Sequence, residues 1–143
     1  MSNILKPDAA PRTLFQAVRD WMGMGQEAHV PEQENAEFKL LYKNLVIGVL
    51  RAAHGEWTFA YSDAFRKQPE LKTLVEFPDL GKEYTSKHLW PSFVMRLPSL
   101  KQAEIQDVIK REGIDASDEV QLLRRFGHKT IANPFELVES SRG

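Results

Sequence analysis

Three apolar runs joined by short polar connections lie in the first half of the chain, and they restrict its fold more than any other feature. The runs cover residues 38–42, 45–50 and 57–61. Runs of this length with turn residues between them are typical of β-strands in a meander. In the third run Trp57, Phe59 and Tyr61 alternate with smaller residues, so all three rings point to one side of a sheet. We expect this side to be a hydrophobic face.

The next part of the chain, up to Pro98, is predicted to add a helical turn, a strand and a helix. Ser62 to Lys67 fits a helical turn that ends before Pro69. The apolar stretch 71–77 fits a fourth strand, and residues 89–97 carry apolar side chains at helical spacing.

Two further helices are predicted from the residues at their ends. Ser99 opens a capping box ahead of an apolar stripe, and Gly113 ends this helix. The stripe consists of Ile105, Val108 and Ile109. Ser117 caps the next helix, which ends at Gly127. The tail over 130–138 is expected to add an edge strand, because its proline cannot donate a hydrogen bond to a central sheet.

These elements predict a fold of the α+β class: a small antiparallel β-meander or partly open barrel packed with about three helices. Residues 1–36 differ in composition from the rest, with an amphipathic pattern over 14–22 followed by a polar, acidic stretch. We expect two parts, namely an N-terminal helical appendage and linker over 1–36, and a domain over 37–143.

The overall composition is that of an ordinary globular chain. Lys and Arg number 19 against 20 acidic residues, which gives a net charge of −1 and no general footprint for nucleic acid. The chain has no cysteine, which excludes disulfides and thiolate chemistry. No apolar run reaches the roughly 18 residues of a membrane span, and the N-terminus lacks the features of a secretory signal. We expect a cytoplasmic protein.

No motif for catalysis, metal binding or a cofactor is present in the sequence. The four histidines lack paired ligand spacing; they are His29, His54, His88 and His128. Glycine-rich phosphate loops, nucleophile elbows and the HRD and DFG motifs of kinases are missing. The neighbouring carboxylates of Asp118 and Glu119 are explained by the first turn of a helix. We expect a protein that is not an enzyme, although an unrecognised small enzyme stays a minor alternative.

The order of several short motifs is more informative than any one of them. The motifs are Phe38-Lys39-Leu40-Leu41-Tyr42, the run 45–50 with Gly48, Trp57-Thr58-Phe59-Ala60-Tyr61, Tyr84-Thr85-Ser86, Leu89-Trp90-Pro91-Ser92-Phe93, Arg96-Leu97-Pro98 and Val120-Gln121-Leu122-Leu123-Arg124-Arg125-Phe126-Gly127. In this order, residues 37 to about 138 resemble the N-terminal subdomain of HipA-type toxins, which also exists as a small protein, HipS, in HipBST toxin–antitoxin systems. Two positions depart from the family pattern, at Pro98-Ser99-Leu100 and at Ala132-Asn133-Pro134.

The resemblance implies a HipS-like antitoxin that docks on a separately encoded HipT-like serine/threonine kinase and keeps it inactive. Because the printed chain ends at Gly143 without a kinase core, we expect a free-standing regulatory domain. The family also includes a HipB-like helix-turn-helix protein that binds operator DNA, and it uses an aromatic residue directed towards the kinase pocket. Direct nucleic-acid or membrane binding is not expected.

Trp90 is the first candidate for such a contact, because it stands at a predicted loop-to-helix junction where a rigid indole serves as an anchor. Its alternative role is packing in the core. His88, Lys87 and Phe93 are the neighbouring candidates, although the spacing of Phe93 also fits the core. Trp57 is a competing anchor with a stronger case for burial.

A DNA-binding regulator or co-repressor acting with a helix-turn-helix partner is the alternative function. The helices over 99–112 and 117–126 are joined by a short glycine-containing link, and basic residues gather late in the chain. They are Lys101, Lys110, Arg111, Arg124, Arg125, His128 and Lys129.

Overall fold

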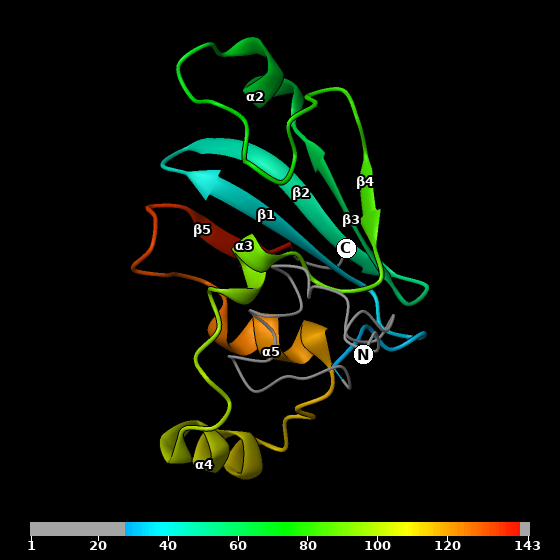
Figure 1. Ribbon diagram of the computed structural model, residues 1–143, viewed down its shortest axis with the longest axis vertical. Helices are drawn as coiled ribbons and strands as arrows, with labels where there is room; N and C mark the ends of the chain where they lie inside the picture. Colours follow the sequence, from blue (N-terminus) through cyan, green and yellow to red (C-terminus); the bar gives the residue numbers. More distant parts are fainter. Residues whose placement is uncertain (1–27, 141–143) are drawn as a thin grey trace, which may run out of the picture.

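The computed structural model describes residues 28–140, which form one open antiparallel sheet with four helices (Figure 1). The strands are β1 Ala36–Tyr42, β2 Leu45–Ala53, β3 Glu56–Tyr61, β4 Tyr84–Ser86 and β5 Glu136–Glu139. The helices are α2 Asp63–Lys67, α3 Pro91–Val94, α4 Ala103–Glu112 and α5 Glu119–Phe126. The strand order is β4-β3-β2-β1-β5. The predicted α+β class is confirmed, with the sheet open at both edges.

The predicted meander of β1, β2 and β3 is confirmed, with tight turns between consecutive strands. Phe38 pairs with Leu50, and Leu50 pairs with Phe59, so large side chains line up across the core face. The β2–β3 turn places His54 and Gly55 at positive φ, the conformation of a tight hairpin turn. Alternation along the strands therefore directs one face of the sheet inward.

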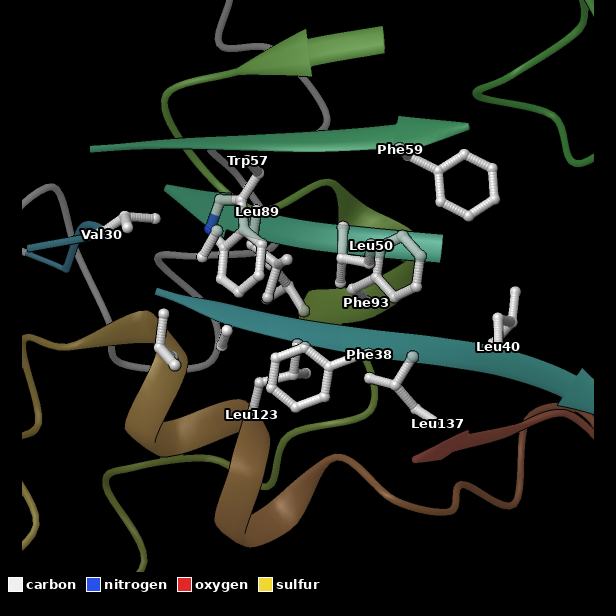
Figure 2. Packing of buried hydrophobic residues seen from close by; sticks show 14 of the residues in the cluster. Val30, Phe38, Leu40, Leu50, Trp57, Phe59, Leu89, Phe93, Leu123 and Leu137 are labelled. Atoms are coloured by element: carbon white, nitrogen blue, oxygen red, sulfur yellow. The ribbon is translucent and has the colours of Figure 1, made fainter. Parts of the chain in front are cut away.

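The inward face packs against α3 and α5. Trp57, Phe59 and Tyr61 are all buried, as the period of two predicts for a hydrophobic face. Figure 2 shows side chains of the sheet meeting Phe93 from α3 and Leu123 from α5. α4 lies beyond α5, away from the sheet (Figure 1).

The fourth strand is not at residues 71–77, as the sequence suggests, but at Tyr84–Ser86. Residues 71–77 form a loop that satisfies its backbone groups through side chains. The Tyr61 hydroxyl donates to the Phe77 carbonyl at 2.6 Å and accepts from the Leu74 amide at 2.8 Å. Phe77 of this loop is buried, and Leu71 and Leu74 are partly buried against the core without a strand partner. The pattern of apolar residues in the sequence does not distinguish such a loop from a strand.

The helices end where glycine predicts, but they begin at other residues than expected. Gly113 lies in the left-handed region after α4. The Ser99 hydroxyl accepts from the Lys101 amide, and α4 begins later, with no side-chain cap. Asp118, not Ser117, caps α5, because its carboxylate reaches the free amides of the first turn.

Two other helix predictions also need correction. The segment with helical spacing over 89–97 contains only the four-residue helix α3, whose first residue is Pro91. The apolar stripe of α4 is half-buried, and no residue of α4 is fully buried. Helical spacing in the sequence thus predicts where both helices lie. It does not predict the length of α3 or the burial of α4.

Part of the linker predicted within residues 1–36 belongs to the folded core. Ala28 and Val30 are buried, and His29 bonds through its backbone to the residues that begin α5: its amide donates to Ser117, and its carbonyl accepts from Glu119. The helix predicted over 14–22 lies outside the described residues, and the division at residue 36 stays a prediction. Within residues 28–140, no helix is long and apolar enough to cross a membrane.

Candidate partner-binding surface

A buried carboxylate, Glu119, holds the segment that carries three of the five candidate residues. Glu119 is the first residue of α5 and is fully buried. Its Oε1 accepts from Trp57 Nε1 at 2.9 Å, and its Oε2 accepts from the Leu89 amide at 3.3 Å. His88 Nδ1 lies 3.8 Å from the same Oε2. The carboxylate therefore joins β3, α5 and the connection from β4 to α3.

The connection from β4 to α3 alternates between buried and exposed side chains. Leu89 and Pro91 are buried, whereas Lys87 is exposed and His88 and Trp90 are partly exposed. A turn closed by Ser86, whose hydroxyl donates to the His88 carbonyl at 2.7 Å, stiffens the same stretch. Its surface residues are thus presented on a fixed backbone.

Trp90 packs against the core and is partly exposed. Its indole meets Phe77 edge to face, with ring centroids 5.0 Å apart and planes at 80°. Phe77 is fully buried. An aromatic ring supported in this way loses little conformational freedom when a partner covers it.

The loop that carries Phe77 is fastened to α3 beside Trp90. The carboxylate of Glu76 accepts from both the amide and the hydroxyl of Ser92, the amide at 2.9 Å. Burial raises the pKa of Glu76, an effect that the Ser92 amide partly offsets. This contact fixes the position of the loop relative to the indole.

Two exposed apolar side chains lie next to the contact between Glu76 and Ser92. Val75 precedes Glu76 and is 96% exposed, and Met95 lies one turn after Ser92 and is 55% exposed. We group these two residues with the partly exposed Trp90 under the name α3 surface, because all three lie on α3, at its ends or on the loop bonded to it. The sequence does not single out Val75 and Met95, because an apolar residue in a predicted strand or at a helix end is expected to be buried.

The other two candidate residues, Trp57 and Phe93, are buried and cannot contact a partner directly. Trp57 is 0% exposed and Phe93 is 1% exposed. Both belong to the core beneath the segment that carries Trp90, so a direct contact with a partner would require the core to open. Their part in a binding site is to support it.

Lys87 and His88 face a different part of the surface, a pocket at the β2–β3 turn. The pocket has a volume of about 560 Å³. It is lined by His29, Val30, Glu32, His54, Gly55, Glu56, Lys87 and His88. Among residues 28–140, no group of three histidine or acidic side chains is placed to hold a metal ion. The structure thus separates these two candidates from the α3 surface.

Carboxylates pair with three of the seven residues in the basic cluster late in the chain. Arg125 makes a bidentate pair with Glu112, at 2.7 and 3.0 Å. Arg124 pairs with Glu139 at 2.8 Å, and Lys129 lies 3.5 Å from a carboxylate of β5. Since a surface for nucleic acid needs unpaired positive charge, these ion pairs reduce the charge that α5 and the residues after it could offer to DNA.

The fold and these residues define a small α+β domain with exposed apolar side chains at α3 and the loop bonded to it. A family model for the HipA N-terminal domain matches residues 38–132, more than half of the 143 residues. The chain therefore belongs to the HipA N-terminal domain family. Comparisons with curated proteins and with solved structures gave no match. The HipA N-terminal domain is a non-catalytic subdomain, and this membership connects the chain to toxin–antitoxin systems of the HipA type.

Proposed function

We propose that the protein is an antitoxin that binds and inhibits a separately encoded HipA- or HipT-type serine/threonine kinase. The observation that carries the proposal is the partly exposed Trp90 on the supported backbone of a HipA N-terminal domain. In this proposal the α3 surface is the main contact with the kinase. A HipB-like DNA-binding protein is a further partner of the same complex.

The physical basis of the contact is the burial of an apolar surface that is already ordered. Interface tryptophans packed at the centre of a contact often dominate its free energy. The indole of Trp90 is held by Phe77, and its backbone is held by the Leu89–Glu119 hydrogen bond. Binding therefore needs little additional ordering of this segment.

The experiment that tests the proposal uses a separately encoded HipA-type kinase from the same genome, with one encoded beside this gene as the first choice. Both proteins are purified, and their affinity and the rate of kinase autophosphorylation are measured. We expect the parent protein to bind and to suppress autophosphorylation. Trp90→Ala should weaken binding by about thirtyfold or more, and Trp90→Phe should lose less.

Because Trp90 also packs on Phe77, the folded state of each variant is checked by urea unfolding. The control is Lys101→Ala, an exposed change outside the α3 surface. A parent protein that neither binds the kinase nor slows its autophosphorylation would refute the antitoxin role. A folded Trp90→Ala variant with parental affinity would remove Trp90 from the contact.

A further inference from the structure

The loop between α5 and β5 is closed at its base by one buried side chain, Arg96. Its Nε donates to the Gly127 carbonyl at 2.6 Å. Its Nη2 donates to the carbonyls of His128 and Phe135, at 2.8 and 2.7 Å. A backbone bond from Leu137 to His128 at 2.9 Å closes the same base. The two ends of the loop are thus held together by four hydrogen bonds.

Arg96 keeps its charge in this position. Burial lowers the pKa of Arg96 to about 10, which is still well above neutral pH. A buried guanidinium needs acceptors for its protons, and three backbone carbonyls supply them here. Hydrogen bonds from a charged donor are stronger than neutral ones, so these three bonds hold the base of the loop firmly.

The tip of this loop carries a fully exposed isoleucine, Ile131. Two turns inside the loop order the residues around it. The Thr130 hydroxyl accepts from the Ala132 amide at 3.2 Å, and the Asn133 side chain accepts from the Phe135 amide at 3.0 Å. A loop ordered in this way presents its large apolar side chain to a partner with little further loss of conformational freedom.

The charge of the loop restricts the kind of surface that it fits. Residues 128–135 contain Lys129 and His128 but no acidic residue. Both basic residues are exposed, and only Lys129 has a nearby carboxylate, Glu136, itself about half exposed. A complementary partner would place an apolar pocket under Ile131 and acidic or neutral groups around it.

The base of the loop adjoins the α3 surface. Met95, which is exposed on that surface, is followed directly by Arg96, which holds the loop. Ile131 and Val75, the two most exposed large apolar side chains in the described part of the chain, are thus both tied to α3 or its C-terminal end. Both residues are therefore connected through hydrogen bonds to the segment that a partner on the α3 surface would cover.

We propose that Ile131 is a second docking anchor, which inserts into an apolar pocket with an acidic rim on the same kinase that covers the α3 surface. This inference rests on the proposed kinase partner. Arg96 is a positioning residue in it, because it fixes the loop without reaching the partner itself. Ile131 adds contact area at a point separate from Trp90.

The test measures the affinity of Ile131 variants for the purified kinase. Ile131→Ser should weaken binding by about tenfold, equivalent to 1.4 kcal/mol, whereas Ile131→Leu should stay close to the parent. Ala132→Ser, an exposed change in the same loop, is the matched control and should bind as the parent does. Because Ile131 is fully exposed, none of these changes should alter the urea midpoint.

A second measurement varies the salt concentration. Lys129→Glu reverses the charge beside Ile131 and should slow association with the kinase, most strongly at low salt. If the parent binds the kinase and Ile131→Ser binds within twofold of it, the second anchor is refuted while the proposed function stands. If the parent does not bind the kinase, the proposed function is refuted, and the proposal of a second anchor is refuted with it.

Discussion

The indole of Trp57 and the carboxylate of Glu119 meet in the core through a hydrogen bond of 2.9 Å, although 62 residues separate them in the sequence. Both side chains are fully buried. The second oxygen of the carboxylate accepts from the Leu89 amide, one residue before Trp90. A single contact in the core thus determines the position of the residue expected to meet a partner.

Glu119→Ala should lower the free energy of unfolding by about 3 kcal/mol, because it leaves the Trp57 indole and the Leu89 amide as buried donors without this acceptor. Glu119→Gln should cost less, since one amide oxygen still accepts from one of them. Urea unfolding followed by tryptophan fluorescence measures the difference. Glu104→Ala, an exposed change on α4, is the control and should stay within about 0.5 kcal/mol of the parent. Equal midpoints for Glu119→Ala and the parent would show that the buried carboxylate adds no stability.

Gly48→Ala should destabilise the sheet, because the position has no room for a methyl group. An added Cβ would lie 2.5 Å from Phe59 Cζ and 2.7 Å from the Ala60 carbonyl oxygen. Such overpacking costs about 2 kcal/mol, measured again by urea unfolding. The control is Gly81→Ala, where the nearest atom to a new Cβ is a carboxylate oxygen of Asp79 at 3.7 Å. If both alanine variants unfold at the same midpoint, close packing around Gly48 does not prevent a larger side chain at this position.

Local patterns in the sequence predict most of the sheet but not its fourth strand. The meander follows from alternation, because each strand pairs with its neighbour in the chain through a short turn. The apolar residues 71–77 suggest a strand but form a loop. There the Tyr61 hydroxyl, in place of a neighbouring strand, bonds to the backbone of Leu74 and Phe77. No local pattern records a hydrogen bond from a side chain ten or more residues away.

The candidate site could be predicted only in part for the same reason. Trp90 was identified because an aromatic residue between Leu89 and proline stands out in the sequence. The sequence predicts Glu119 only as a carboxylate in the first turn of a helix. Its burial beside Trp57 becomes apparent only in the three-dimensional structure. The one signal in the sequence was the indole itself, since a buried tryptophan N–H needs an acceptor.

Glu76→Gln should change how stability depends on pH. Burial raises the folded-state pKa of Glu76 above its ordinary value of 4.5, so the folded protein binds this proton more tightly than the unfolded chain does. The stability that Glu76 contributes is therefore fully present below the ordinary pKa and is lost as the pH rises through the raised value. Relative to Glu76→Gln, the parent should lose stability over this window and then level off.

The measurement is a set of urea unfolding curves for both proteins from about pH 4 to pH 7. Ser92→Ala removes the hydroxyl that donates to Glu76 and should make the pH-dependent loss of stability larger. A difference between the parent and Glu76→Gln that grows in favour of the parent as the pH rises would contradict the raised pKa.

Val75 and Met95 separate the binding role of the α3 surface from its role in folding. Trp90→Ala removes packing on Phe77 as well as exposed area, so its effect on binding mixes the two. The double change Val75→Ser and Met95→Ser removes only side chains that are 96% and 55% exposed, and the free energy of unfolding should move by no more than about 0.5 kcal/mol. Affinity for the kinase, measured by calorimetry, should nevertheless fall by about tenfold.

The matched control is Val138→Ser, which also removes an exposed apolar side chain but lies on β5 beside the buried Leu137, on the opposite face of the sheet. This variant should bind the kinase as the parent does. If it weakens binding as much as the double change, the contact involves general surface hydrophobicity or the outer face of the sheet. Only a loss confined to Val75 and Met95, at unchanged stability, assigns the contact to the α3 surface, because both side chains are exposed.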